Sequence, residues 1–568
     1  MKKDLGKVGV LFAVLMISLQ ANAIMIKNVP AGSEINKMVE NIPAIYVVEG
    51  DCELKGDMIV ADGSIFKFEG GKITGSGVIK GKRLMIDAPK YHIFDENVSV
   101  NGIANGEVSA HWWGAVGDGV VNDAPAINRA LKNAGSSWVV LDNLKYMIDE
   151  TIEIGFRQKF RCDGILLYRG SKAAIDLQNT NIEIDIFELR QNAGEEGGQN
   201  GPFIGSGVLF SGNVFNSNIN IDRILYFNKA FDISPKHSKI AKETYRGIQY
   251  CKISWQYVMG EYGIYIDMVS GMLTDGKPRH TWVNENQFNG GRLLCRYGLY
   301  STPVGDKYKG AIDAINGNVF NSVGFEGEGA IRCKAITLYN AWHNNFNDLR
   351  LSEGYVSIGQ PWIELIQCGY LHFSFKSQIP YSSVKATRCN HIEMRGVFTD
   401  DGLGYIDGYD RLYILNESPA YNPLSKNTIK NCESVKILTR SAVATSDVKR
   451  IYVGISEANP QGMIIENVNF NDLFFTNNDG RKALSDKCFI SVYDKSTLNV
   501  SVDHSLIYAY LGLEMICEIS AGSKIVLTNA RGQKITLNES GIYEVNPEGN
   551  DFVILKVSEK GSRIIRAK

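Results

Sequence analysis

Between residues 51 and 88 the apolar residues come in short groups, several of them at a period of two, such as Met58 with Val60 and Phe66 with Phe68. Glycine or Asp-Gly separates the groups. Alternation over so few residues, bounded by turn residues, is typical of very short strands joined by tight turns. No Asn-Gly loop joins two matched strands in this stretch, which argues against a hairpin meander. The pattern therefore predicts a region of short β-strands over residues 24–110.

Further along the chain, one short phrase recurs and indicates a stacked architecture. Asn286-Gln287-Phe288-Asn289 returns as Asn318-Val319-Phe320-Asn321 and again as Asn344-Asn345-Phe346-Asn347, at offsets of 32 (318 − 286) and 26 (344 − 318). A fixed phrase at variable spacing is typical of a solenoid with loop insertions. Each coil is too small to bury its own apolar face, so it must stack on its neighbours.

The recurring phrase predicts a register between coils. Strands of successive coils lie about 4.8 Å apart, so equivalent residues should form columns along the solenoid axis. The asparagines should lie at turns, where their amides can form hydrogen-bonded ladders, and two apolar columns should lie inside. The expected columns are Asn286, Asn318 and Asn344; Phe288, Phe320 and Phe346; and Leu293, Phe325 and Leu351.

One stretch departs from the strand pattern. In "HWWGAVGDGVVNDAPAINRALKNAG", residues 111–135, apolar residues fall at i, i+3, i+4 and i+7, which predicts a short amphipathic helix. Asp123 can cap this helix, Pro125 suits its first turn, and Gly135 can end it. A solenoid of strands leaves unpaired backbone and apolar core at its open end, which the helix should cover. The apolar stripe consists of Ile127, Ala130, Leu131 and Ala134.

The same stretch resembles a known family. "WGAVGDGVVNDAPAI", residues 113–127, is similar to the N-terminal signature of the pectate lyase superfamily, roughly aromatic-G-A-x-G-D-G-x-x-D-D-x-x-A-I, although Asn122 stands where an aspartate is usual. The resemblance implies an all-β fold, a right-handed parallel β-helix that binds oligosaccharide along a lateral groove. It does not select an activity, because polysaccharide lyases, glycoside hydrolases and phage tailspikes share this start. The matching residues are Trp113, Gly114, Ala115, Gly117, Asp118, Gly119, Asp123, Ala126 and Ile127.

The two ends of the chain differ from the middle. Residues 1–23 read as a cleavable signal peptide, with an apolar run ending before Ala21-Asn22-Ala23. No cysteine follows closely, which argues against lipid attachment and favours a secreted or periplasmic protein. Residues 111–485 are the predicted β-helix. Residues 486–568 alternate regularly and predict a small antiparallel β module that serves as a cap, an oligomerisation element or a carbohydrate-binding module.

Charge and cysteine content narrow the classes of partner. The formal net charge of −2 leaves no electrostatic signature of nucleic acid or anionic membrane binding. Nothing after residue 23 reads as a membrane span. The ten cysteines are scattered without a C-x-x-C pair, and we interpret them as buried thiols rather than as zinc ligands. These observations favour a polysaccharide or oligosaccharide partner and leave a homo-oligomer open.

The main candidate site lies in the repeat region. If Phe325 points inward, Glu326 and Glu328 point outward, and the register places Arg296 beside Glu328. Arg292 and Arg350 should bracket Gly324 on the neighbouring coils. Such a face could bind an acidic sugar and supply an acid and a base, which hydrolysis requires of paired carboxylates. The alternative is a solvated face of weak ion pairs.

Aromatic and acidic clusters provide further candidates. Trp282, Tyr297, Trp342 and Trp362 could stack on sugar faces or pack in the core, and His343 could act as an acid or base or simply occupy a turn. A glycine-rich loop carries Asp400, Asp401, Asp407 and Asp410. Asp400 and Asp401 could form a catalytic pair, the loop could bind Ca²⁺, or it could be plain surface. No other cofactor is expected.

Two functions follow. The first is an exported polysaccharide-degrading enzyme, a glycoside hydrolase or polysaccharide lyase, acting on an acidic or pectin-like glycan. A lyase would use an arginine face to neutralise a uronate carboxylate, so the arginine-rich candidate site fits either reaction. The second is a non-catalytic glycan-binding or structural β-helix, such as an adhesin or a tailspike shaft.

Overall fold

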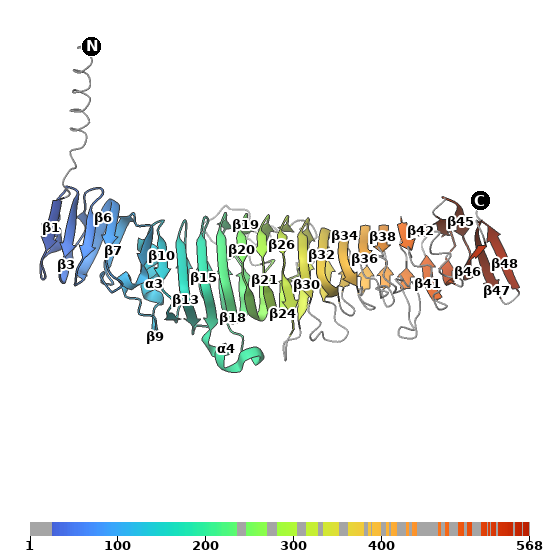
Figure 1. The fold of residues 1–568 in the computed structure, drawn as a ribbon, viewed down its shortest axis with the longest axis horizontal. Helices are drawn as coiled ribbons and strands as arrows, with labels where there is room; N and C mark the ends of the chain where they lie inside the picture. Colours follow the sequence, from blue (N-terminus) through green and yellow to red (C-terminus); the bar gives the residue numbers. More distant parts are fainter. Residues whose placement is uncertain are drawn as a thin grey trace, which may run out of the picture. The chain divides into compact units, whose positions relative to one another are not determined.

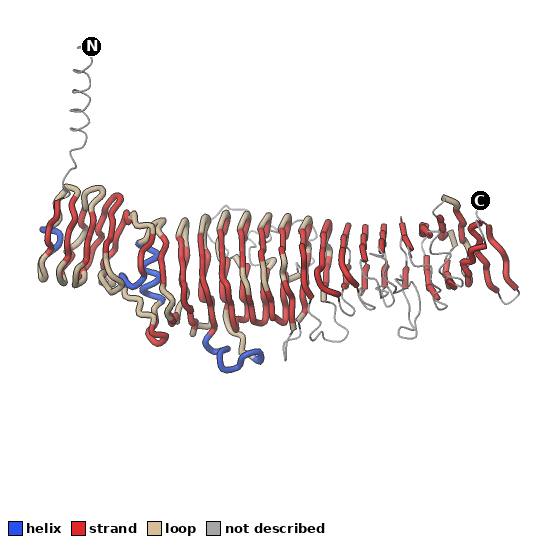
Figure 2. Tube along the Cα trace, viewed as in Figure 1, coloured by secondary structure: helices blue, strands red, loops and turns tan. Residues whose placement is uncertain are grey.

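The computed structural model describes residues 25–235, 246–269, 281–303, 314–327, 333–351 and 362–379, and further short stretches, mostly strands, between residues 384 and 566. The chain divides into two compact units. Residues 1–117, 123–141 and 158–161 form the first, and residues 118–122, 142–157 and 162–568 form the second. Strands dominate the described part of both units, and its helices are short (Figure 2).

The first unit starts with short strands, as the sequence predicts. They pair in the order β1-β2-β5-β6-β3, and β4 and β7 also pair with β6. Figure 1 labels β1, β3, β6 and β7 of this region. All of these pairings are parallel, so this region is coiled rather than folded into hairpins. The strands are β1 (Met25–Val29), β2 (Ala44–Val48), β3 (Cys52–Lys55), β4 (Met58–Ile59), β5 (Ile65–Phe68), β6 (Ile73–Asp87) and β7 (Val98–Ile103).

The predicted helix is confirmed as α3 (Ala124–Asn133), in the first unit. Its apolar stripe is buried, and Gly135 follows it in the left-handed conformation with φ 63°. The Asn133 side chain accepts a hydrogen bond from the backbone N–H of Val100, at 2.6 Å. The helix therefore satisfies a backbone N–H group within β7.

The role of Asp123 differs from the expected one. Asp123 is the N-cap residue of α3, but its side chain makes no cap hydrogen bond. Its carboxylate instead accepts hydrogen bonds from the backbone N–H groups of Val116 (2.6 Å) and Gly117 (3.2 Å). The predicted N-cap position is confirmed. The expected side-chain cap was wrong, because the carboxylate is directed at the preceding glycine-containing loop.

In the second unit, a repeat runs through four short faces, each with its own parallel partner strand on the next coil. In the repeat from Thr281 to Ser301, β22 (Thr281–Asn284) is face 1 and β23 (Gln287–Asn289) is face 2. β24 (Arg292–Ser301) supplies faces 3 and 4, because its two halves pair with different strands, β27 (Gly324–Glu326) and β28 (Lys334–Tyr339).

Successive repeats pair in parallel, face by face. The fold class expected from the sequence is thereby confirmed as an all-β parallel β-solenoid. Face 1 continues through β17 (Val214–Phe215), β19 (Arg246–Gln249), β25 (Ile315–Asn316) and β29 (Ala341–Trp342), and face 2 through β20 (Lys252–Ser254) and β26 (Val319–Asn321). Strands that cross several faces are β15 (Glu183–Gln191), β18 (Asn218–Ile233), β21 (Tyr257–Ile266), β30 (Asn345–Leu351) and β32 (Gly369–Ile379), and β14 (Ala173–Leu177), β16 (Ser206–Phe210) and β31 (Ile363–Ile366) belong to face 4.

A file of stacked phenylalanines fills the interior behind face 2, as predicted. The rings of Phe288 and Phe320, and of Phe320 and Phe346, have centroids 4.6 Å apart and are nearly parallel. Phe373 extends the file at 4.5 Å. The second predicted column is also confirmed, since the register pairs Leu293 with Phe325 and Phe325 with Leu351.

The predicted asparagine ladder lies beside this file and is fully buried. The Asn286 amide donates to Oδ1 of Asn318 at 2.9 Å, and the Asn318 amide donates to Oδ1 of Asn344 at 2.8 Å. Each Oδ1 also accepts the backbone N–H of the preceding asparagine, at 3.0 Å. These side chains therefore satisfy polar backbone in the core and fix the register of neighbouring coils.

Near the C-terminus both kinds of pairing occur. β40 (Asp472–Phe475), β42 (Thr497–Val502) and β44 (Lys524–Asn529) pair in parallel. β43 (Leu513–Ile519), β46 (Gly541–Glu548), β47 (Asp551–Ser558) and β48 (Gly561–Arg566) pair antiparallel. The domain boundaries drawn from the sequence stay a prediction.

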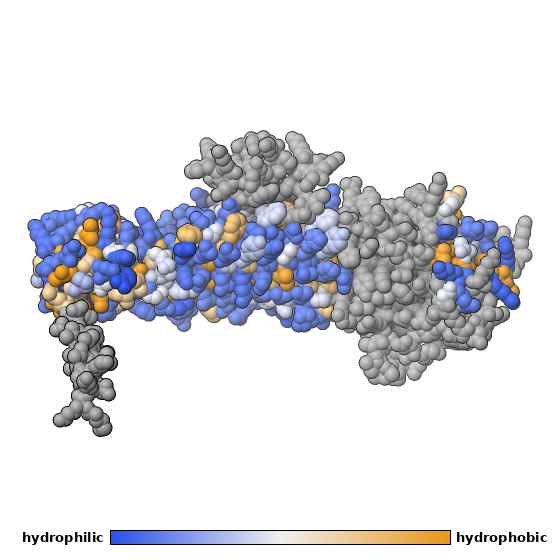
Figure 3. All heavy atoms as spheres, turned by 90° about the horizontal axis from the view of Figure 1, so that it is seen from above, coloured by the Kyte–Doolittle hydropathy of each residue, from blue (hydrophilic) through white to orange (hydrophobic). Residues whose placement is uncertain are grey.

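Other features bear on the surface and the thiols. The described cysteines are free and buried. Hydrophilic residues cover most of the described surface visible in Figure 3, with hydrophobic residues between them. Over the described residues, no helix is long and apolar enough to cross a membrane. The expected signal peptide, residues 1–23, lies outside the described residues.

We expect Asn318→Ala to destabilise the fold by about 2–4 kcal/mol, because it removes several buried hydrogen bonds and leaves their partner groups unsatisfied in the core. Asn321→Ala is the matched control, since Asn321 hydrogen-bonds to Asn289 and Asn347 in a ladder on the outer surface. Urea unfolding followed by circular dichroism measures both. Equal stability of the two variants would contradict the role given to the buried ladder.

Candidate functional site

A row of residues with the left-handed backbone conformation lies at the corner between faces 1 and 2. The members have φ between 50° and 67°. The backbone N–H of each member except the last donates a hydrogen bond to a carbonyl on the next coil, that of the residue directly before the next member. Tyr250 donates to Asn284 at 3.3 Å, and Glu285 donates to Asn316 at 2.8 Å. We call this row the corner row. It consists of Arg157, Asn181, Asn216, Tyr250, Glu285, Gly317, His343 and Tyr370.

Several members are unfavourable choices for this backbone conformation. Left-handed geometry suits glycine and asparagine and costs other residues on the order of 1 kcal/mol. Tyr250, Glu285, His343 and Tyr370 nevertheless occupy it. Their side chains add little to the core, since 55% of Tyr250 and 41% of Tyr370 are exposed. Strain held at exposed residues is a reason to look for function here.

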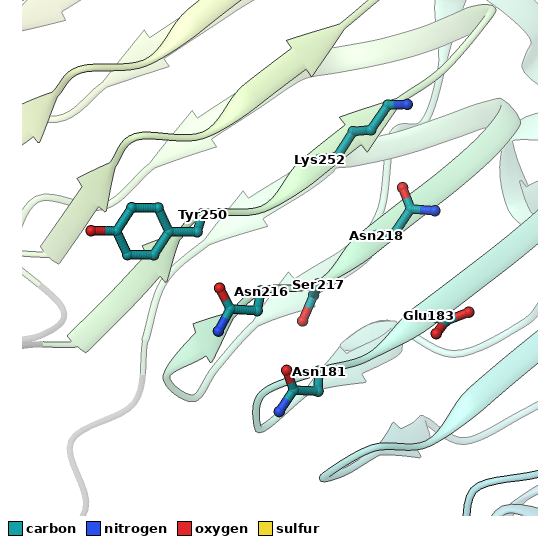
Figure 4. A pocket seen from close by; sticks show the side chains of 7 residues that line it. All are labelled: Asn181, Glu183, Asn216, Ser217, Asn218, Tyr250 and Lys252. Carbon is teal, nitrogen blue, oxygen red and sulfur yellow. The ribbon is translucent and has the colours of Figure 1, made fainter.

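An open groove of about 550 Å³ runs beside the N-terminal part of the corner row. Its second wall is on face 2, where Glu183, Asn218 and Lys252 stand in register on successive coils. Figure 4 shows these three side chains in one line and Asn181, Asn216 and Tyr250 in another, with Ser217 between them. We call this feature the corner groove.

The C-terminal part of the corner row carries an aromatic cluster. The imidazole of His343 stacks on the Tyr370 ring, with centroids 4.8 Å apart and planes inclined by 10°. The Trp342 ring lies 6.0 Å from Tyr370. A side chain at Gly369 would collide with Trp342, because a Cβ there would lie 2.5 Å from the indole, so the glycine makes room for it.

Ionisable groups along both walls are paired or alternate in sign. Tyr250 donates a hydrogen bond to the Glu285 carboxylate, and this contact raises the pKa of the Tyr250 phenol. His372 Nδ1 lies 3.0 Å from Glu393 Oε2 on face 2. The walls also carry two positive side chains, Arg157 and Lys252, and two negative ones, Glu183 and Glu285. Neither sign therefore dominates the walls.

The structure brings part of the predicted arginine–glutamate site together on face 3. Arg292 forms an ion pair with Glu326, and Gly324 lies in register between Arg292 and Arg350, as expected. A Cβ at Gly324 would lie 3.5 Å from the Arg350 guanidinium. Glu326 is 28% exposed, so it faces outward as predicted.

The register that placed Glu328 beside Arg296 does not extend that far. Leu294 pairs with Glu326 at an offset of 32 (326 − 294), but Tyr297 pairs with Lys334 at an offset of 37 (334 − 297). Arg296 instead pairs with Glu261, at 2.9 Å. Glu328, Asp400 and Asp401 lie outside the described residues, so their catalytic roles stay predictions.

The predicted aromatic residues fall in different places. Trp342 and His343 belong to the aromatic cluster of the corner row. Trp282 is half-buried on face 1, in register with Gly247. Trp362 is fully buried, so its ring cannot stack on a ligand in this structure. Tyr297 lies on face 4. Within the described residues, no group of three or more His, Cys, Asp or Glu side chains could hold a metal ion.

Sequence reasoning did not find the corner row, although a signal was present. Glu285, Gly317 and His343 each directly precede a buried asparagine of the recurring phrase. Because their residue types share no property, the pattern of apolar and polar positions gave no reason to group them. The shared property is the backbone conformation, which only the structure shows.

These coils and their groove define the class of the chain as a parallel β-solenoid with a lateral groove. No protein-family model and no curated protein matches the sequence. Solved structures similar to it include a hyperthermoactive exopolygalacturonase from Thermotoga maritima, at 10% identity over 77% of this chain and 95% of that chain, with a TM-score of 0.28.

Two further solved structures are similar. One is the Dettilon tailspike protein, at 12% identity over 82% of this chain and 76% of that chain, with a TM-score of 0.29. The other is PfbA, a surface adhesin of Streptococcus pneumoniae, at 12% identity over 81% of this chain and 98% of that chain, with a TM-score of 0.22. TM-scores this low mean that the superposed chains diverge widely, so the likeness assigns neither an activity nor a ligand.

We expect Glu285→Gln to lower the pKa of Tyr250 toward its ordinary value. The carboxylate favours the protonated phenol as hydrogen-bond acceptor and as neighbouring negative charge, and a neutral amide removes most of that preference. Carbon NMR of Cζ-labelled tyrosine over a pH titration measures the change. Glu183→Gln, on the facing wall, should leave this pKa unchanged. An unaltered Tyr250 titration in Glu285→Gln would contradict the contact.

Proposed function

We propose that this chain binds a polysaccharide along the corner groove. The observation that carries the proposal is the corner row itself, in which exposed rings and amides recur at the coil spacing of about 4.8 Å. A straight file of equivalent positions suits a linear polymer whose own units repeat. Export through the predicted signal peptide would bring the chain to polysaccharides outside the cytoplasm.

The side chains of the groove have the chemistry of sugar recognition. A pyranose ring has apolar CH faces, which pack on aromatic rings such as Tyr250 in the groove and Tyr370 further along the corner row. Its hydroxyl groups both donate and accept hydrogen bonds, which matches the amides of Asn181, Asn216 and Asn218. Because the charges on the walls balance, we propose a neutral glycan as the ligand of this groove.

We expect Tyr250→Ala and Tyr370→Ala each to weaken polysaccharide binding about three- to tenfold, since each removes one stacking surface. Affinity electrophoresis through gels containing xylan, mannan, galactan, dextran or polygalacturonate measures retention. Phe187→Ala is the control, because Phe187 is also exposed but lies on the turn between faces 2 and 3. Equal retention of all variants, or no retention of the wild-type protein in any gel, would overturn the proposal.

A second candidate function is cleavage of an acidic polysaccharide on face 3, by hydrolysis or β-elimination. The observation that favours it is Arg350, which has no ion pair within the described residues and lies across Gly324 from the Arg292–Glu326 pair. Arg350 could hold a uronate carboxylate through two parallel hydrogen bonds. Glu326 would leave its ion pair with Arg292 when substrate binds, and would act as the acid or base that transfers the proton. The sequence resemblance to the pectate lyase superfamily agrees with this chemistry.

We expect Glu326→Gln to reduce cleavage of polygalacturonate at least a hundredfold while the fold is unchanged, as is usual when a proton-transfer group is removed. Glu261→Gln is the matched control, because Glu261 is also paired with an arginine, Arg296, but at the corner between faces 3 and 4. Absorbance of unsaturated products and release of reducing ends are read together. Absorbance marks elimination and reducing ends alone mark hydrolysis. No cleavage by the wild-type protein, or full activity of Glu326→Gln, would remove this candidate.

A further inference from the structure

Four tyrosines form a cluster on face 4. Tyr262 pairs in register with Tyr297, and Tyr265 with Tyr300, on the adjacent strands β21 and β24. The rings of Tyr262 and Tyr297 stack with centroids 4.7 Å apart and planes inclined by 13°, and those of Tyr265 and Tyr300 lie 5.9 Å apart at 17°. Tyr262 also meets Tyr265 edge-on at 5.2 Å. We call these four residues the tyrosine patch.

The patch faces outward. Gly263 and Gly298, each next to a patch tyrosine, face the interior, because a Cβ at Gly263 would lie 3.2 Å from Leu293 and one at Gly298 would lie 2.3 Å from Phe325. Strand alternation then directs Tyr262 and Tyr297 away from the core. All four tyrosines are half-buried, whereas the residues between them are buried.

The phenol groups of the patch have no hydrogen-bond partner among the described residues. Across the described part of the chain, no hydrogen bond is made by the hydroxyl of any of the four tyrosines, and none of these oxygens is fully buried. Partial burial raises the pKa of the phenols of Tyr262, Tyr265 and Tyr300. They therefore stay protonated at neutral pH and can donate as well as accept hydrogen bonds.

Oppositely charged pairs limit the patch at both ends. On the preceding coil, Lys229 lies 3.7 Å above the Tyr265 ring and within 3.4 Å of Asp232. On the coils that follow, Lys334 pairs with Glu364. The charges cancel within each pair. Asp267 adds a carboxylate close enough to Tyr265 to contribute to the raised pKa of its phenol. The patch is thus an aromatic surface of two coils, rimmed by polar groups that include the carboxylates of Asp232, Asp267 and Glu364.

We propose that the tyrosine patch is a second carbohydrate-binding site that takes a neutral pyranose oligosaccharide. Stacked rings match the CH faces of the sugar, and four free hydroxyls with two charged rims match its hydroxyl groups. An anionic ligand would meet the carboxylates at the rim, and a purely apolar one would leave the phenols without partners. The choice of a sugar rests on the proposed function, but the site shares no residue with the corner groove.

Isothermal titration with cellohexaose, xylohexaose and mannohexaose tests the patch. We expect one of these probes to bind the wild-type chain at two sites. Tyr262→Ala/Tyr297→Ala should keep only the corner site, and Tyr250→Ala should weaken binding only at the corner groove. Tyr262→Phe/Tyr297→Phe keeps the rings and should retain binding at the patch with a several-fold loss of affinity. Circular dichroism and urea unfolding confirm that each variant is folded.

The outcomes separate the two proposals. Two intact sites in Tyr262→Ala/Tyr297→Ala, or a single wild-type site that is lost only in Tyr250→Ala, would overturn the patch and leave the corner groove standing. A single wild-type site that is lost only in the patch variant would support the patch and overturn the corner groove. No binding of any probe by the wild-type chain would overturn the patch.

Discussion

Parallel pairing of each coil with the next, held in one register, is the constraint on which the second unit depends. A single coil cannot bury its own apolar residues, so its core exists only between neighbours. The buried asparagine ladder fixes the register, because each amide has its partners on the adjacent coil. A slip of one residue would turn the phenylalanine file toward solvent and leave those amides unsatisfied in the core.

The same register organises the surface. Whatever faces outward at one position recurs on the next coil, so corners and faces become straight rows of side chains. At the corner between faces 1 and 2, the regular backbone hydrogen bonds impose the left-handed conformation whichever residue occupies the position. Tyrosine, glutamate and histidine are then displayed at a conformational cost that a glycine or asparagine would avoid, as Asn181, Asn216 and Gly317 do in the same row. The tyrosine patch arises in the same way on face 4, without that cost.

Much of the interior could be predicted from the sequence, and less of the surface. The interior columns follow from repeated residue types, as with Asn318 over Asn344 and Phe320 over Phe346, because burial demands similar side chains at equivalent positions. Face 3 was found in part: Arg292, Gly324 and Arg350 align, but inserted residues after Glu326 changed the offset and gave Arg296 a different partner, Glu261. Asp123 was misassigned because a carboxylate before a helix can equally bind the loop on its other side.

The corner groove and face 3 present different chemistry on one scaffold. The groove carries balanced charge and exposed rings, and face 3 carries Arg350, which has no ion pair among the described residues. The central claim is that the corner row is where a glycan lies. Hydroxyl-radical footprinting with mass spectrometry, with and without a retained polysaccharide, tests it most directly. The account predicts protection of Tyr250, His343 and Tyr370 while the exposed Phe187 stays reactive. Unchanged oxidation along the corner row, with the polysaccharide bound, would contradict it.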